Sequence, residues 1–346
     1  MGETLISISP RDGRGMAQVD ALLAREGIRR DANLEYTCGI LDENGRLIAT
    51  GSCFKNTLRC FAVDSSRQGE GLLGRIATHL MEWQSEQGRY RLFVCTKCQS
   101  ARFFQDIGFH EIARVDGALS FLENRREAFG RYCATLAKTR REGKSAAIVM
   151  NANPFTLGHR ALVERAAAEN DWVHLFVLSE EAGPIPFSVR RMLVTEGVSD
   201  LPNVICHPSG PYIISSLTFP SYFFRDEEDV IRGHARLDLE LFKSFAGALG
   251  VTARYVGEEP ASRTTALYNR IMAEELPAAG IRCVVVPRRT HDGRAISASD
   301  VRRAIREDRL ADIRDLVPDA TWNYFSSPRS RVVVEMIRNS GPETHD

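Results

Sequence analysis

The most constraining feature of this chain is the alternation of short apolar runs with helical patterns after residue 145. Five runs have the length and composition of buried strands, and three stretches between them have helical periodicity. The strand candidates are Ala146–Met150, Val173–Ser179, Asn203–Cys206, Ala253–Val256 and Cys283–Val286; the helical stretches are His159–Glu169, Val189–Val198 and Val230–Leu249. Strands that alternate with helices favour a parallel sheet with helices on both faces. Such sheets bind ligands at the carboxyl ends of their strands.

The first part of the chain has a different pattern. Apolar runs at Tyr36–Leu41 and Arg46–Thr50 flank an Asn-Gly pair, which is a strong hairpin signal. The next candidates are a strand at Leu58–Val63, a helix at Leu72–Gln84, a strand at Arg91–Cys95, a helix at Ser100–Ile107 and a strand at His110–Val115. This order predicts an antiparallel sheet with helices packed on it, and hence an α+β domain.

Charge places the boundary between two domains near residue 140. Residues 1–145 carry 22 basic and 18 acidic groups, which gives a net charge of +4. Residues 146–346 carry 23 basic and 27 acidic groups, which gives a net charge of −4. The change occurs in the polar stretch 138–144, which is typical of a linker or of a helix end before a strand. We therefore expect domains at 1–140 and 141–346.

Composition excludes several classes of protein. The net charge is zero, which argues against a nucleic-acid-coating protein. Only five of the 45 basic residues are lysines and no Gly-Lys-Ser/Thr triplet occurs, so a Walker-type phosphate loop is excluded. No apolar run has the roughly 18 residues of a membrane span, so we expect no membrane partner and a cytoplasmic location. The pair Cys95 and Cys98 suits a zinc site or structural thiols, and no metal ligand set is assigned.

The strongest chemical signal is the segment 151–159, N-A-N-P-F-T-L-G-H, which follows a strand candidate and opens a helix. The start of that helix is an anion site, because its backbone N–H groups are unpaired. Gly158 lets a ligand approach the backbone, and Thr156 and His159 can both point at the anion. Asn153 and Phe155 belong to the same candidate site. The structural alternative is an N-capping threonine beside a surface histidine.

Two other helix starts carry hydroxyls and arginines. Ser297 or Ser299 would cap a helix whose first turn holds Arg302, which offers hydroxyl, amide and guanidinium donors to one polyphosphate. Arg190 lies at the start of a helix after the second strand, where it is a candidate phosphate ligand or a member of a solvated charged pair.

These motifs together resemble the nucleotidylyl transferase superfamily, whose members bind ATP on a Rossmann-like sheet. Thr156 stands where many members have a first histidine, and the usual I-S-S-T-x-V-R is here I-S-A-S-D-V-R, which lacks a hydroxyl at Ala298. The resemblance implies that Thr156 and His159 hold the phosphates at the catalytic centre. It also implies that Ser297, Ser299 and Arg302 contribute to the ATP site, with Mg²⁺ on the departing pyrophosphate.

The remainder of the chain narrows the resemblance. The aromatic, hydroxyl-rich stretch 210–223, the segment 236–240, Y-V-G-E-E-P at 255–260 and the pair 268–269 together resemble the citrate lyase ligase family. The first 140 residues resemble a GCN5-related acetyltransferase domain, through Q-G-E-G at 68–71 and the helix-turn at 101–109. Leu73 departs from that family's loop, in which the last position is small, so turnover of acetyl-coenzyme A is not implied.

The resemblance to citrate lyase ligases implies a concrete reaction. Acetate and ATP would form acetyl-adenylate, and the acetyl group would pass to the thiol of citrate lyase's acyl carrier subunit, on its phosphoribosyl-dephospho-coenzyme A arm. AMP and pyrophosphate would be released without an enzyme nucleophile. The pocket for acetate or the carrier arm would include Tyr212, Ser215, Ser216 and Thr218, although the same stretch could simply complete the core. The N-terminal domain would dock the arm.

Two other functions remain open at this point. The chain could be a plain adenylyltransferase, acting on a mononucleotide or phosphopantetheine and fused to an acetyltransferase-like domain. It could also be a coenzyme-sensing module with degenerate sites. Exchange of pyrophosphate into ATP distinguishes the three functions. It would require acetate for the ligase, it would require a mononucleotide or phosphopantetheine for the adenylyltransferase, and it would be absent for the sensing module.

Overall fold

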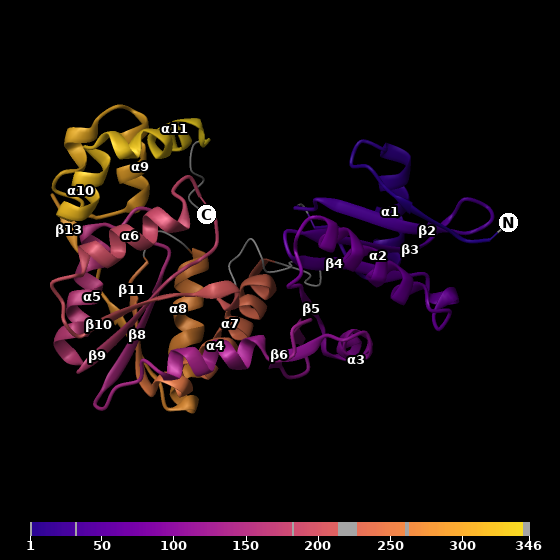
Figure 1. Cartoon of the computed structure of the whole chain (residues 1–346), viewed down its shortest axis with the longest axis horizontal. Coiled ribbons are helices and arrows are strands. Elements are labelled where there is room, and N and C mark those ends of the chain that lie inside the picture. The colour runs from indigo at the N-terminus through magenta and orange to yellow at the C-terminus, as the bar shows by residue number, and fades with distance from the viewer. Residues whose placement is uncertain (1, 32, 182, 214–226, 260–262, 342–346) are drawn as a thin grey trace. The chain divides into compact units, whose positions relative to one another are not determined.

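The computed structural model describes residues 2–31, 33–181, 183–213, 227–259 and 263–341 (Figure 1). By its internal contacts the chain forms two compact units. The first holds residues up to 130 and the first part of helix α7 (Glu227–Leu249), and the second holds residues 131–213 and those from 241 onward. The polar stretch 138–144 lies between helix α4 (Ala128–Ala137) and strand β8 (Ser145–Met150).

The N-terminal unit contains a seven-stranded sheet in the order β1-β2-β3-β4-β5-β7-β6. Its strands are β1 (Thr4–Ser7), β2 (Tyr36–Leu41), β3 (Leu47–Phe54), β4 (Thr57–Val63), β5 (Phe93–Lys97), β6 (His110–Val115) and β7 (Leu119–Glu123); its helices are α1 (Gly13–Arg25), α2 (Leu72–Glu86) and α3 (Ala101–Asp106). The prediction of an antiparallel sheet is wrong at one pair, because β4 and β5 run parallel. They pair only at Thr57↔Phe93 and Leu58↔Val94.

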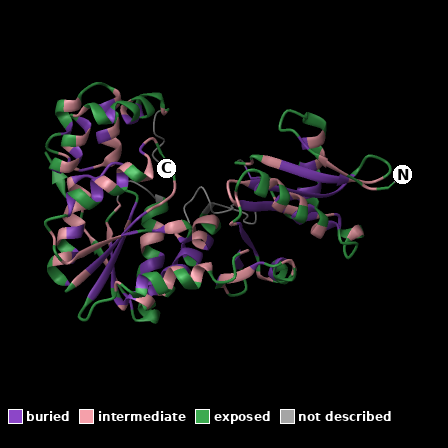
Figure 2. Ribbon diagram, in the orientation of Figure 1, coloured by how far each residue is buried: buried purple, intermediate pink, exposed green. Residues whose placement is uncertain are grey.

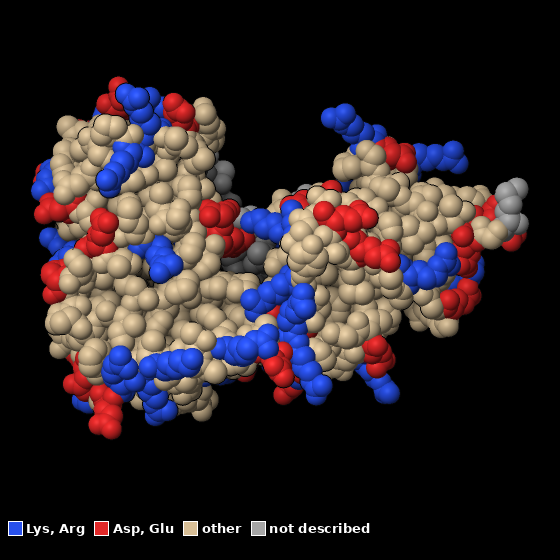
Figure 3. Space-filling model, in the orientation of Figure 1, with Lys and Arg blue, Asp and Glu red and all other residues tan. Residues whose placement is uncertain are grey.

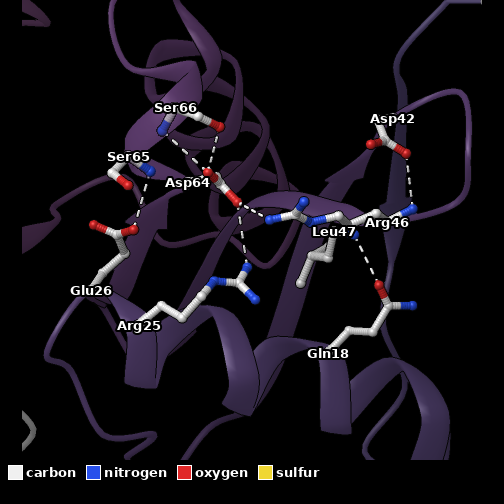
Figure 4. A network of polar contacts seen from close by, with 9 residues as sticks. All are labelled: Gln18, Arg25, Glu26, Asp42, Arg46, Leu47, Asp64, Ser65 and Ser66. Atoms are coloured by element: carbon white, nitrogen blue, oxygen red, sulfur yellow. Dashed lines mark hydrogen bonds and ion pairs between the residues drawn. The ribbon is translucent and has the colours of Figure 1, made fainter.

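A polar network fastens helix α1 to the end of β4 (Figure 4). The largely buried carboxylate of Asp64 accepts hydrogen bonds from the guanidinium groups of Arg46, at 2.6 Å, and Arg25, at 3.4 Å. The hydroxyl of Ser66, at 2.7 Å, and its backbone N–H also donate to this carboxylate. These two bonds are the main reason that the pKa of Asp64 is lowered. The network holds the chain at the start of the loop that leads into α2.

The C-terminal unit contains a five-stranded parallel sheet in the order β10-β9-β8-β11-β12, which confirms the parallel α/β prediction. Its further strands are β9 (Trp172–Val177), β10 (Val204–Pro208), β11 (Val251–Gly257) and β12 (Arg282–Val286); its further helices are α5 (Leu157–Glu169), α6 (Phe187–Gly197), α8 (Arg263–Glu275), α9 (Ala298–Arg306), α10 (Asp319–Phe325) and α11 (Arg331–Asn339). The chain leaves β8 toward β9 on one side and later returns to β11 on the other. The crevice at the carboxyl ends of β8 and β11 is therefore the switch point at which such sheets bind ligands.

The core of this unit lies on both faces of the parallel sheet. Ile148, Leu175 and Tyr255 are fully buried on three neighbouring strands, and Figure 2 shows these strands largely purple between helices with exposed outer faces. Basic and acidic side chains are interspersed over the surface visible in Figure 3, as expected for a chain without net charge. Among the described residues, no helix is both long enough and apolar enough to cross a membrane.

Candidate functional site

A cavity of about 640 Å³ opens at the carboxyl edge of the parallel sheet. It lies where β8, β11 and β12 end and where helices α5 and α9 begin. Gly158 lines it, together with the polar residues Asn151, Thr156, His159, Glu259, Thr265, Arg288, Ser297, Ser299 and Asp300. Two of the predicted motifs, one at 151–159 and one at 295–303, therefore share a single cavity although about 140 residues separate them.

Thr156 and His159 form a reciprocal cap at the start of α5. The Thr156 hydroxyl accepts the backbone N–H of His159 at 3.3 Å, and the backbone N–H of Thr156 donates to His159 Nδ1 at 3.1 Å. A backbone N–H can only donate, so Nδ1 must be the unprotonated ring nitrogen. The proton of the neutral imidazole is therefore on Nε2, which is left to donate to a ligand.

The electrostatic environment keeps His159 neutral. Burial, followed by the positive charges of Arg288 and Arg302, lowers the pKa of His159 from 6.5 to about 4. At neutral pH the ring is thus a neutral hydrogen-bond donor, and it does not act as a cation. The positive end of α5 and the two guanidinium groups supply the charge that an anionic ligand would meet.

The second motif caps α9 and reaches back to the first. The Ser297 hydroxyl accepts the backbone N–H of Ser299 at 3.1 Å, which makes Ser297 the N-cap residue. Arg302 donates to the backbone carbonyl of Asn153 and, at 3.1 Å, to the Ser299 hydroxyl. Arg302 thereby fixes the loop after β8 against the start of α9, so that both helix N-termini line one cavity.

Gly158 lies where the two motifs approach most closely. A Cβ atom at this position would come within 3.3 Å of the carbonyl oxygen of Ile296 and within 3.5 Å of the Thr156 hydroxyl. A side chain at residue 158 would therefore require the segment before α9 to shift by a few tenths of an ångström. The glycine thus favours the close approach of the two segments, because a Cβ at this position would be in tight contact with the Ile296 carbonyl.

Arg190 has a different environment from a ligand-facing arginine. It is buried, and its donors reach the carbonyl oxygens of Ile185, Asn151, Leu178 and Glu180, at 2.5–3.0 Å. The guanidinium group thus joins the chain segments that follow β8 and β9. A direct contact of Arg190 with phosphate stays a prediction, whereas its role in shaping these two segments follows from its bonds.

The other predicted nucleotide ligands of the first motif lie deeper. Phe155 is fully buried, and its backbone carbonyl accepts a hydrogen bond from Thr321 at 2.9 Å. Asn153 is buried beside Gly183, and its carbonyl is the acceptor for Arg302. Both residues support the loop from beneath, and their contact with a ligand stays a prediction.

The predicted acid or carrier-arm pocket is only partly described. Ser215, Ser216 and Thr218 lie outside the described residues. Tyr212 is fully buried, with its ring 5.1 Å from that of Tyr132, and it is not among the residues that line the cavity. The substrate role of this stretch stays a prediction.

Sequence reasoning gave no site role to three polar residues of the cavity, although Glu259 belongs to the segment 255–260 that carries the family resemblance. Arg288 lies two residues after the end of β12, Glu259 lies two residues after the end of β11, and Thr265 lies in the first turn of α8. Arg288 and Glu259 form an ion pair across these two strand ends. The signal that could have found them was the one used for the first motif, since polar residues directly after a predicted parallel strand belong to the ligand-binding edge.

A second cavity, of about 650 Å³, lies in the N-terminal unit where β4 and β5 diverge. The predicted loop contributes Gln68, Gly69 and Gly71, and the departing residue Leu73 is also part of the lining. Cys95 lines it as well, and burial raises the pKa of that thiol to about 12, so the thiol is not a ready nucleophile.

Comparison with known proteins places these features in a family. A family model described as the citrate lyase ligase C-terminal domain matches residues 145–325. The citrate (pro-3S)-lyase ligase of Klebsiella pneumoniae is 39% identical over 313 residues, covering 89% of this chain and 91% of the relative. The Escherichia coli protein of the same name is 36% identical over 323 residues, covering 91% and 92%.

A similar solved structure is the acetyltransferase of the GNAT family from Staphylococcus aureus. It is 13% identical, has a TM-score of 0.31, and covers 36% of this chain and all of its own.

The parallel sheet with helices packed on it defines the second unit as an α/β fold, and sheets of this kind bind ligands at the carboxyl edge of their strands. The matches extend over both units at more than 30% identity. The chain belongs to the citrate lyase ligase family, whose members are acid–thiol ligases and hence enzymes.

Proposed function

We propose that this chain is an ATP-dependent ligase that acts on citrate lyase, activating acetate as acetyl-adenylate and acetylating the prosthetic thiol of the acyl carrier subunit. The observation that carries the proposal is the cavity of about 640 Å³ that the N-termini of α5 and α9 share, lined by His159, whose Nδ1 accepts the Thr156 N–H and whose Nε2–H is left to donate. Family membership supplies the reaction class, and the cavity supplies donors suited to a polyphosphate.

In the first step a carboxylate oxygen of acetate attacks the α-phosphorus of ATP. The bond from that phosphorus to the bridging oxygen breaks, and pyrophosphate leaves with the electron pair. Phosphoryl-type transfer depends mainly on positioning and charge stabilisation. The Nε2–H of His159 and the N–H groups of the α5 N-terminus would stabilise the developing charge, each contributing roughly 3 kcal/mol if typical of preorganised donors. Thr156 holds the ring in the tautomer that can donate.

In the second step the carrier thiol, as thiolate, attacks the acetyl carbonyl carbon. The carbon–oxygen bond to AMP breaks, AMP leaves, and the thiol proton passes to solvent. Neither step needs an enzyme nucleophile, because acetate and the thiol are themselves the nucleophiles.

Mg²⁺ would accompany the nucleotide and neutralise charge on its phosphates. The described residues contain no group of three metal-ligating side chains. Two carboxylates line the cavity, Glu259 and Asp300, and both are paired with arginines. Mg²⁺ commonly binds through one or two carboxylates together with substrate phosphates. We therefore assign most of its coordination to the nucleotide, with Asp300 as the available protein oxygen, because the carboxylate of Glu259 is held by Arg288.

The N-terminal cavity would dock the coenzyme-like arm of the carrier. Its loop and the diverging strands β4 and β5 form a hollow of about 650 Å³, which suits an elongated ligand. Gly74 lines it and has open space around its missing Cβ. The variant Gly74→Trp should raise the KM for the carrier and leave acetate-dependent exchange unchanged. An unchanged carrier KM in a folded variant would remove the docking role.

The exchange of radiolabelled pyrophosphate into ATP tests the proposed function. We expect exchange that requires acetate and does not require the carrier. Exchange that requires a mononucleotide or phosphopantetheine would assign a plain adenylyltransferase. No exchange with any acid or nucleotide would indicate a binding module and would overturn the proposal.

A further inference from the structure

The cavity contains one arginine that no predicted motif includes. Arg288 leaves the carboxyl end of β12, and its side chain is 30% exposed. Its Nε donates to the carbonyl of Glu258 at 2.8 Å, and its Nη2 donates to the carboxylate of Glu259. Both acceptors follow β11, the strand that pairs with β12. Two neighbouring strand ends thus orient this guanidinium group.

The bonds of Arg288 leave part of its guanidinium fork uncommitted. Within the described part of the chain, Nη1 has no hydrogen-bond partner. Arg302 and Arg190, in contrast, donate hydrogen bonds to carbonyl and hydroxyl oxygens of the protein itself. Arg288 is therefore the arginine of the cavity lining that keeps donors for a ligand.

Stability does not explain the placement of this arginine. Glu259 is 16% and Arg288 30% exposed, and ion pairs that water reaches contribute little to stability. The guanidinium group is also close enough for its charge to lower the pKa of His159, which lines the same cavity. A guanidinium held by a carboxylate and a carbonyl, with a free edge toward a ligand, is a common arrangement for binding carboxylates and phosphates.

We propose that Arg288 is an oxyanion-binding residue of this cavity, positioned by Glu259 and Glu258, that contacts the polyphosphate or the carboxylate which the cavity receives. This inference rests on the proposed function, which it deepens. Arg288 binds from the β12 side, and His159 and the α5 N-terminus bind from the β8 side. The ligand anion would thus meet donors that follow two different strands of the sheet.

The test must separate binding from simple neutralisation of Glu259, because Arg288→Gln alone leaves an unpaired carboxylate that repels anions. The decisive variant is therefore Arg288→Gln with Glu259→Gln, which removes both charges. The matched control is Arg289→Gln, since Arg289 is the next residue, is exposed, and is not part of the cavity lining. Thermal unfolding of each full-length variant verifies the fold.

Calorimetric titration with ATP and the KM for acetate in pyrophosphate exchange are the two readouts. We expect the double variant to weaken ATP binding, or to raise the acetate KM, by about 10- to 100-fold, as for a lost charge-assisted hydrogen bond. A change in ATP affinity assigns the contact to phosphate, and a change confined to acetate assigns it to the carboxylate. Arg288→Lys should recover part of the loss, and Arg289→Gln should match the wild type.

Wild-type values for both ligands in the folded double variant would overturn the inference and leave the proposed function intact. A wild-type chain that binds neither ATP nor acetate would overturn both. The two failures are therefore distinguishable in one experiment.

Discussion

The substitution His159→Asn separates the two roles of this histidine, which are to cap helix α5 and to donate a hydrogen bond to the ligand. The Asn Oδ1 can take the place of Nδ1 and accept the Thr156 N–H, which now donates at 3.1 Å. The Asn side chain has no donor where Nε2–H lies. The cap is thus retained and the ligand-facing donor is lost. Removal of one preorganised donor typically lowers the rate by about 10²–10³, or roughly 2.7–4 kcal/mol of transition-state stabilisation.

The comparison variant is His159→Ala, which loses the donor and half of the reciprocal cap. A lost helix cap lowers the free energy of unfolding by about 0.5–2 kcal/mol. We therefore expect His159→Asn and His159→Ala to lose acetate-dependent exchange to a similar extent, and only His159→Ala to be measurably less stable in urea. Initial rates of exchange and urea midpoints provide the two measurements.

A third variant, His159→Gln, places an amide donor nearer to the Nε2 position and gives up the acceptor for Thr156. It should recover part of the exchange rate at a cost in stability. Exchange by His159→Asn within a few-fold of the wild type would refute the assignment of Nε2–H as a ligand donor. Equal losses of stability in His159→Asn and His159→Ala would refute the tautomer argument.

Three further predictions concern pH, Arg190 and the α9 cap. Burial is the main cause that lowers the pKa of His159, His174 and His207 to about 4; the unfolded chain therefore takes up protons first, and stability should fall as pH drops from about 6.5 toward 4. Between pH 7 and 5 the free energy of unfolding should fall by about 1–2 kcal/mol for each histidine that titrates independently of the others, measurable as a shift of the urea midpoint. A constant midpoint over this range would contradict it. Arg190→Lys should reduce the free energy of unfolding by about 2–4 kcal/mol, because an ammonium cannot reach all the acceptors that the guanidinium bonds; wild-type stability would contradict the joining role. Ser297→Ala should cost about 0.5–2 kcal/mol as a lost cap and also weaken ATP binding in calorimetry, whereas a stability loss alone would leave Ser297 a purely structural residue.

Local patterns in the sequence predicted much of the fold. Strands β2 and β6 have the predicted bounds, because an Asn-Gly turn and flanking breakers delimit them. Helix α1 was not predicted, since it begins with Gly13-Arg-Gly; its signals were the apolar residues Val19, Leu22 and Leu23 on one face and Asp12, whose side chain accepts the Gly15 N–H at 3.0 Å. The parallel pairing of β4 with β5 depends on strand order in space, which no local pattern determines.

In the candidate site, too, the local features could be predicted from the sequence and the contacts between distant residues could not. The T-x-G-H segment could be recognised because its cap is formed by residues three apart. The bond from Arg302 to the Asn153 carbonyl joins residues 149 apart, so only the fold reveals it. Nothing in the sequence around Arg190 indicates that it is buried, yet the segments that follow β8 and β9 enclose it. Arg288 and Glu259 meet because β11 and β12 are neighbours, which the order of the chain does not imply.

Mass spectrometry of purified carrier subunit after incubation with this protein, ATP and acetate is the most direct measurement. Addition of one acetyl group to the prosthetic thiol, with AMP and pyrophosphate formed in equal amounts, is the predicted result. Formation of ADP and phosphate, or an unmodified thiol despite acetate-dependent exchange, would contradict the proposed reaction.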